Sequence, residues 1–99
     1  MQAKIKYDFS GKLWKYNGQG GWFIISLPKE ISKEIRANLK WQEEGWGRMK
    51  AIGQVKGIEW DTAIWFDKKA DTYLLPVKAD IRNKANLKLD DIISVSISI

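Results

Sequence analysis

The sequence contains no cysteine and no histidine, and only two prolines, in a chain of 99 residues. Without cysteine the chain can form neither disulfides nor thiolate metal sites. Without histidine it has neither the usual acid–base group at neutral pH nor a Ser–His or Cys–His nucleophile pair. We therefore expect no catalytic residues, no metal site and no cofactor, and the prediction is that the protein is not an enzyme.

Long apolar segments are also missing from the sequence. No run approaches the roughly 20 residues that a membrane-spanning helix needs, and the start Met1-Gln2-Ala3-Lys4 has no hydrophobic stretch typical of a secretory signal. Apolar residues still make up 44% of the chain, which is enough for one core. We expect one cytoplasmic domain over residues 1–99 that does not contact a membrane.

Apolar and polar residues alternate along several segments, as in half-buried strands. Residues 3–14 alternate around Tyr7 and Phe9, residues 22–27 form a short apolar run, and residues 46–66 form a hairpin around Lys56-Gly57. Further strands are expected over 72–75 and from about 92 to 99, with a turn at Asp90-Asp91 before the last. The pattern predicts a mainly β domain.

Two short helices are expected after the two prolines. Pro28 precedes Ile31, Ile35 and Leu39 at helical spacing, and Pro76 precedes Ile81 and Ala85. The order strand, Leu-Pro, helix, strand thus occurs twice, at Leu27-Pro28 and at Leu75-Pro76. This repeat suggests a duplicated unit, in which case one chain would hold two copies and could be a monomer. A dimer stays open.

Six tryptophans are many for a small domain. By strand parity Trp60 is expected in the core, and Trp22 in a central strand. Trp14, Trp46 and Trp65 break the apolar parity of their strands, and two interpretations stay open for them: large rings that fill the barrel, or exposed anchors for a ligand.

The net charge of +5 is concentrated in two segments. Residues 1–20 hold four lysines and one aspartate, and residues 46–70 hold five basic and three acidic residues. Lys12, Arg48 and Lys50 share the outward parity of Trp14 and Trp46. A basic sheet face with aromatic rings suits single-stranded nucleic acid or an anionic aromatic ligand.

Several short motifs together make the chain resemble the domain of unknown function 1905 family. They are spread over nearly the whole length: Phe9-Ser10-Gly11-Lys12-Leu13-Trp14, Gly20-Gly21-Trp22-Phe23, Leu27-Pro28, Ser32-Lys33-Glu34-Ile35-Arg36, Gly45-Trp46-Gly47-Arg48, Thr62-Ala63-Ile64-Trp65-Phe66 and Tyr73-Leu74-Leu75-Pro76-Val77-Lys78. The resemblance implies a small double-split β-barrel of about six strands with two strand–Pro–helix–strand units. Swapped-hairpin transcription factors of the AbrB and MazE kind share this architecture class. The chain departs from the family at Asp90, where a glycine is usual, and at Ala63, where a serine is common. The resemblance brings no catalytic or binding residues with it.

Three functions are consistent with these observations. The first is a non-catalytic binding module that takes an unknown small molecule or protein on the candidate residues Trp14, Trp46, Trp65, Lys12, Arg48 and Lys50. The second is a nucleic-acid-binding, AbrB-like regulatory protein. The third is a carboxylate-based enzyme using Glu59 and Asp61, which lie two apart on one strand face; it requires that at least one of them be partly buried.

Overall fold

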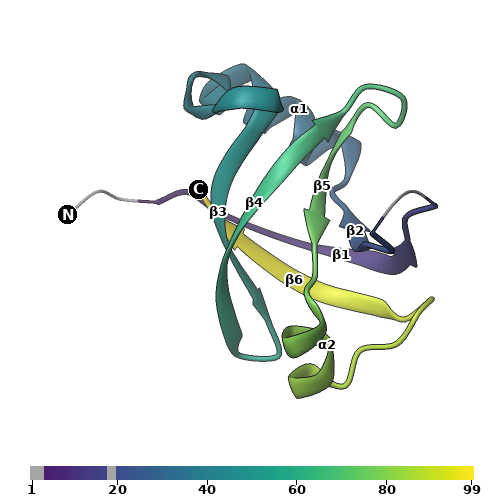
Figure 1. Cartoon of the computed structure of the whole chain (residues 1–99). Coiled ribbons are helices and arrows are strands. Elements are labelled where there is room, and N and C mark those ends of the chain that lie inside the picture. Colours follow the sequence, from purple (N-terminus) through teal and green to yellow (C-terminus); the bar gives the residue numbers. More distant parts are fainter. Residues whose placement is uncertain (1–3, 18–19) are drawn as a thin grey trace.

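The computed structural model describes residues 4–17 and 20–99, with the side chain of Trp46 excepted. It contains six strands, two α-helices and two short 3-10 helices (Figure 1). In chain order these are β1 (Lys6–Lys15), β2 (Phe23–Ser26), α1 (Lys29–Leu39), η1 (Lys40–Gln42), η2 (Gly45–Gly47), β3 (Arg48–Val55), β4 (Ile58–Asp67), β5 (Thr72–Pro76), α2 (Ala79–Ala85) and β6 (Ile92–Ser98). Among these described residues no helix is long and apolar enough to cross a membrane.

The six strands form a closed barrel in the order β1-β2-β5-β4-β3-β6, and every neighbouring pair is antiparallel. Each strand therefore has a neighbour on both sides, although β4 pairs with β5 only from Trp65 to Asp67. The helices lie at opposite ends of the barrel (Figure 1), and Ile35 of α1 and Ile81 of α2 belong to the same buried core as the strands. The predicted small β-barrel with two short helices is confirmed.

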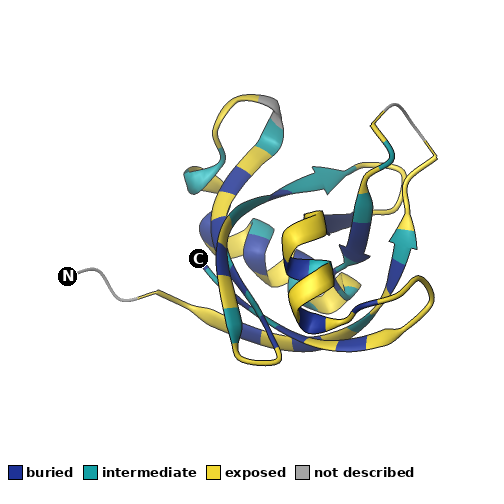
Figure 2. Cartoon of the chain, turned by 60° about the horizontal axis from the view of Figure 1, so that its bottom comes forward, coloured by how far each residue is buried: buried dark blue, intermediate teal, exposed yellow. Residues whose placement is uncertain are grey.

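The core positions follow the alternation of the sequence. In β1 the side chains of Tyr7, Phe9 and Leu13 are buried, and in β6 those of Val95 and Ile97 are buried, while the residues between them face outward. Figure 2 shows this as alternating buried and exposed bands along the strands. The predicted strands are therefore confirmed by burial as well as by pairing.

The barrel has an approximate two-fold symmetry in its connectivity. Exchanging β1 with β4, β2 with β5 and β3 with β6 leaves the order of strands around the barrel unchanged. The centre of the symmetry is the pairing of Ile25 with Leu75, because the flanking pairs, Ile24–Pro76 and Ser26–Leu74, exchange with each other. The topology agrees with the hypothesis of a duplicated unit.

Aligning the two Leu-Pro pairs predicts that the second helix starts two residues earlier than it does. Pro28 lies directly before α1, and its carbonyl accepts a bond from the Ser32 amide. The equivalent carbonyl before α2 belongs to Lys78, which accepts from the Arg82 amide. Pro76 is instead the last residue of β5. The expectation that Pro76 starts a helix is wrong because β5 continues along β2 through this residue.

The turn before β6 places Asp90 in the left-handed region, at φ 71°. Its backbone amide donates to the Leu13 carbonyl, which holds the turn against β1. A residue with a Cβ is strained there, whereas glycine is not. This explains physically why a glycine suits this position.

We expect Asp90→Gly to raise the free energy of unfolding by about 0.5–1 kcal/mol, because it relieves the strain at this φ. The ion pair that is lost, Lys12 to Asp90 at 3.9 Å, joins two well-exposed side chains and adds little. Asp90→Ala is the control: it also removes the carboxylate but keeps the Cβ, and should be less stable than the parent. Urea unfolding that ranked alanine equal to glycine would contradict this account.

Candidate binding groove

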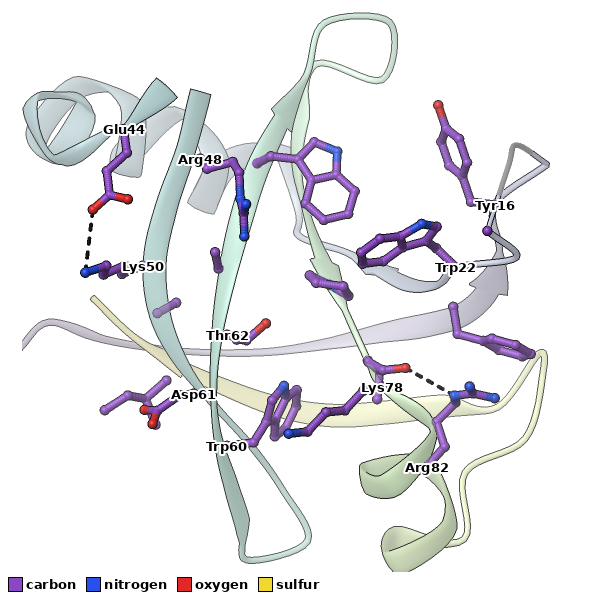
Figure 3. Close-up of a pocket in the computed structure, with 18 of the residues that line it drawn as sticks. Tyr16, Trp22, Glu44, Arg48, Lys50, Trp60, Asp61, Thr62, Lys78 and Arg82 are labelled. Atoms are coloured by element: carbon purple, nitrogen blue, oxygen red, sulfur yellow. Dashed lines mark hydrogen bonds and ion pairs between the residues drawn. The ribbon is translucent and has the colours of Figure 1, made fainter. Parts of the chain in front are cut away.

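One groove on the outer surface of the barrel collects aromatic and basic side chains. It has a volume of about 1260 Å³ and lies across β3, β4 and the β2–β5 pair, reaching α2 (Figure 3). Register brings its central residues together, because Arg48 lies opposite Trp65 and Lys50 opposite Ala63. Three of the six predicted site residues, Arg48, Lys50 and Trp65, therefore line one surface.

Lys12 and Trp14 lie outside this groove, and the prediction of one continuous basic face is wrong. Both belong to β1, which is not a neighbour of β3. Around the ring, β6 lies between β1 and β3 on one side, and β2, β5 and β4 lie between them on the other. Lys12 pairs with Ile92 of β6 and makes the weak ion pair with Asp90. Equal strand parity places residues outside the barrel but does not say on which side of it. The side chain of Trp46 lies outside the described residues.

Trp14 and Trp65 flank a small apolar layer on the outside of the barrel. Ile24 and Leu74 are fully buried although they point outward, away from the main core cluster. Trp14 is the cross-strand neighbour of Ile24, and Trp65 is that of Leu74. Both tryptophans are half-buried, and the Trp14 indole N–H donates to the Ser26 hydroxyl at 2.9 Å. The placement supports a packing role for Trp14, while Trp65 both packs and lines the groove.

Trp22 is one of several groove residues that the sequence did not indicate. It precedes β2 rather than lying within it, and 52% of its surface is exposed. Its ring meets that of Trp65 edge to face, with centroids 5.9 Å apart and planes at 81°. The expectation that it belongs to a central strand is wrong, because β2 begins one residue later, at Phe23; Trp22 has the outward parity of Ile24 and Ser26. Polar Ser26 was the available signal for that parity.

Gly20 lies directly against the Trp22 ring. A Cβ at this position would lie 2.7 Å from the indole nitrogen, closer than packed atoms approach, and the backbone φ of 93° also favours glycine. The turn before β2 therefore supports the Trp22 ring from one side, while Trp65 contacts it from another. An exposed tryptophan held in this way needs little ordering when a ligand stacks on it.

Trp60 lies at the inner wall of the groove. Only 6% of its surface is exposed, which confirms the prediction of a core residue, yet it also lines the groove. Its ring packs on its cross-strand partner Gly53, where a Cβ would come within 2.7 Å of the ring. The absence of a side chain at Gly53 is what leaves room for the indole.

Basic side chains surround the aromatic rings. The lining includes five of them, against the two acidic residues Glu44 and Asp61: Lys4, Arg48, Lys50, Lys78 and Arg82. Lys50 and Glu44 form an ion pair at 3.8 Å. Within residues 4–17 and 20–99, no carboxylate is in ion-pair contact with Arg48, Lys78 or Arg82. The groove thus carries a net positive charge.

The arginine of α2 is held in place by two contacts. Its guanidinium lies over the Phe23 ring, 3.6 Å from the centroid, and its Nε donates to the Val77 carbonyl at 3.1 Å. In Figure 3 Arg82 and Lys78 enter the groove from the side of α2, whereas Arg48 enters from β3. The terminal nitrogens of Arg82 make no other hydrogen bond within the described part of the chain.

The acidic residues of β4 do not form a desolvated pair. Glu59 and Asp61 are both exposed. The described residues also contain no group of three acidic side chains placed to hold a metal ion. The exposure of both residues does not favour the carboxylate-enzyme hypothesis.

The fold and the groove define a class: a small, closed six-stranded β-barrel with an aromatic, basic depression on its outer wall. The family model named domain of unknown function (DUF1905) matches residues 9–97, and the chain belongs to this family. The comparison with curated proteins gave no match.

Proposed function

We propose that this chain is a non-catalytic binding module, with the groove as its ligand site and a small molecule as its partner. The observation that carries the proposal is Trp22, a large ring left half exposed beside Trp65 in a charged depression. Exposed aromatic residues in concave surfaces are typical anchors for ligands. One chain supplies every wall of the groove, so a monomer suffices, and we propose the cytoplasm as its compartment.

The proposal predicts that Trp22→Ala will weaken the binding of planar aromatic compounds at least tenfold and leave the fold intact. The ring provides stacking surface but is half exposed, so its loss should lower the melting temperature by only a few degrees. Binding is followed in ¹⁵N-labelled protein by the indole N–H resonances, of which that of Trp22 is identified by its absence in the variant.

Trp41→Ala is the matched control for this experiment. Trp41 is 78% exposed and lies on η1, outside the groove lining. Its removal should change neither binding nor stability. If no planar compound shifts the Trp22 resonance, or if Trp22→Ala unfolds the protein, the proposed site is wrong.

A second candidate function is the binding of single-stranded nucleic acid. The observation in its favour is the set of five basic residues around rings on which bases could stack. A bound strand would lose affinity steeply as salt rises, because each neutralised phosphate releases counterions. Binding that ignores the salt concentration would exclude this alternative.

A further inference from the structure

Each end of the barrel has an arginine stacked on a phenylalanine, but only one of these arginines has an anionic partner. At the α1 end, Arg36 lies over Phe66, 4.0 Å from the ring centroid, and its Nη1 is 3.5 Å from a carboxylate oxygen of Glu43. At the α2 end, Arg82 lies over Phe23 without a carboxylate in ion-pair contact among the described residues. The Arg36–Glu43 pair is thus an example, within the same molecule, of a guanidinium that stacks on phenylalanine and binds a carboxylate.

We infer that the groove binds a small molecule in which a planar ring is joined to an anionic group, the ring stacking on Trp22 and the anion bound by Arg82, with Lys78 adding positive charge from the α2 side. This inference rests on the proposed function and specifies its ligand. The ligand's anion would take the place at α2 that Glu43 occupies at α1.

Arg82 suits an anion because it is already ordered. Stacking on Phe23 and the bond from Nε to Val77 hold the guanidinium plane, so the side chain loses little entropy on binding. The fork of terminal nitrogens matches a carboxylate or a phosphate in a bidentate manner. Lys78, exposed and four residues earlier in the chain, adds a second charge from the α2 side; in Figure 3 its ammonium end lies near Trp60, whereas the Arg82 guanidinium points the other way.

Trp22 suits the ring. In its edge-to-face contact with Trp65 the two rings cover only part of each other, and half of the Trp22 surface stays exposed. A flat ring placed there would stack on the exposed part of the indole, as bases do on aromatic platforms. Consecutive strand residues point to opposite faces, yet Trp22 and Phe23, on which Arg82 stacks, both line the groove.

The distribution of charge favours a small anion over a nucleic-acid strand. A strand requires a basic track, but Asp61 and Glu44 also line this groove, and Glu44 engages Lys50. The lining thus mixes acidic with basic side chains, unlike a continuous basic track. The groove volume, about 1260 Å³, is slightly above the range of about 300–1,000 Å³ that holds small ligands.

The test compares four probes by their effect on the Trp22 indole resonance of the full chain: AMP, adenosine, inorganic phosphate and a six-nucleotide single strand. AMP should bind at least ten times more tightly than adenosine, which has the ring without the anion. Phosphate, which has the anion without the ring, should bind more weakly than AMP. Arg82→Gln and Lys78→Gln should each reduce the advantage of AMP over adenosine at least threefold.

Lys12→Gln is the matched control, because it removes one positive charge outside the groove and should leave the AMP-to-adenosine ratio unchanged. Should Arg82→Gln perturb the fold, Lys78→Gln decides the point alone, since the Lys78 side chain is exposed. Equal binding of AMP and adenosine overturns the inference while the proposed site stands. If none of the probes shifts the Trp22 indole resonance, both the inference and the proposed site are wrong. Strand binding that is much tighter than AMP binding and steeply salt-dependent also overturns the inference, in favour of nucleic acid.

Discussion

Replacing Gly53 with alanine is expected to lower the free energy of unfolding by about 2–3 kcal/mol. An alanine Cβ would lie 2.7 Å, 2.8 Å and 3.0 Å from three carbons of the Trp60 ring, well inside packing distance. Gly53 is buried and paired on both sides, with Trp60 of β4 and Ile97 of β6, so the strand cannot shift freely. The indole would have to leave its position in the core.

A double-mutant cycle with Trp60→Leu tests this cause. In the Trp60→Leu background the added methyl meets no ring, and Gly53→Ala should cost less than about 0.5 kcal/mol. Alanine also loses less conformational entropy in a strand than glycine does, which further lowers the cost of Gly53→Ala in this background. Urea unfolding measures all four proteins. A cost for Gly53→Ala that is the same in both backgrounds would show that the Trp60 contact is not its origin.

Tyr73→Phe is the second change with a large expected effect, a loss of about 2 kcal/mol at neutral pH. Tyr73 is fully buried, and its hydroxyl donates to a Glu43 carboxylate oxygen at 2.7 Å. Hydrogen bonds to charged groups contribute about 1.5–3 kcal/mol. Arg36 contacts the same oxygen, and Phe66 meets the Tyr73 ring edge to face at 5.3 Å, so the bond closes the α1 end of the barrel.

The same contact makes stability depend on alkaline pH. Burial, followed by the bond to Glu43 and its charge, raises the pKa of Tyr73 well above its ordinary value. In the unfolded chain Tyr73 loses its proton near pH 10, whereas in the folded chain it keeps it. Its contribution to stability is therefore fully present below about pH 10 and is lost as pH rises toward the folded pKa, by up to about 1.4 kcal/mol per pH unit.

Urea unfolding at pH 7 and from pH 9.5 to 11 distinguishes the two proteins. The parent should lose stability more steeply than Tyr73→Phe above pH 10, so the difference between them shrinks there. Tyr16→Phe is the control, because Tyr16 is exposed and its hydroxyl has no hydrogen-bond partner within residues 4–17 and 20–99. Parallel pH profiles for the parent and Tyr73→Phe would contradict the proposed network.

Much of the fold could be predicted because strand and helix periodicity are local properties. The alternation in β1 and β6 identified their buried residues, and Lys56-Gly57 forms the expected turn, with positive φ at both positions. Ile35 and Ile81 were correctly assigned to the core. What failed was the register of the repeat, because Leu-Pro marks the start of α1 but the end of β5.

The candidate site was only half predictable. Arg48, Lys50 and Trp65 come from one hairpin, and a hairpin register follows from its turn. Trp22 comes from the turn before β2, and Lys78 and Arg82 come from α2 and the residue that precedes it; no local pattern indicates that these two segments share a surface with the hairpin. Lys12 was grouped with the wrong strands for the same reason.

The residue pattern alone was sufficient for a mainly β domain with two short helices, because burial on one face imposes a period of two or 3.6 on any chain. It was also sufficient to rule out chemistry that needs cysteine or histidine in this chain. The tertiary structure was needed to show which outward residues meet, because the order of strands around a barrel depends on contacts between distant segments. It was likewise needed to show that Arg36 is paired with Glu43 and that Arg82 has no such partner among the described residues.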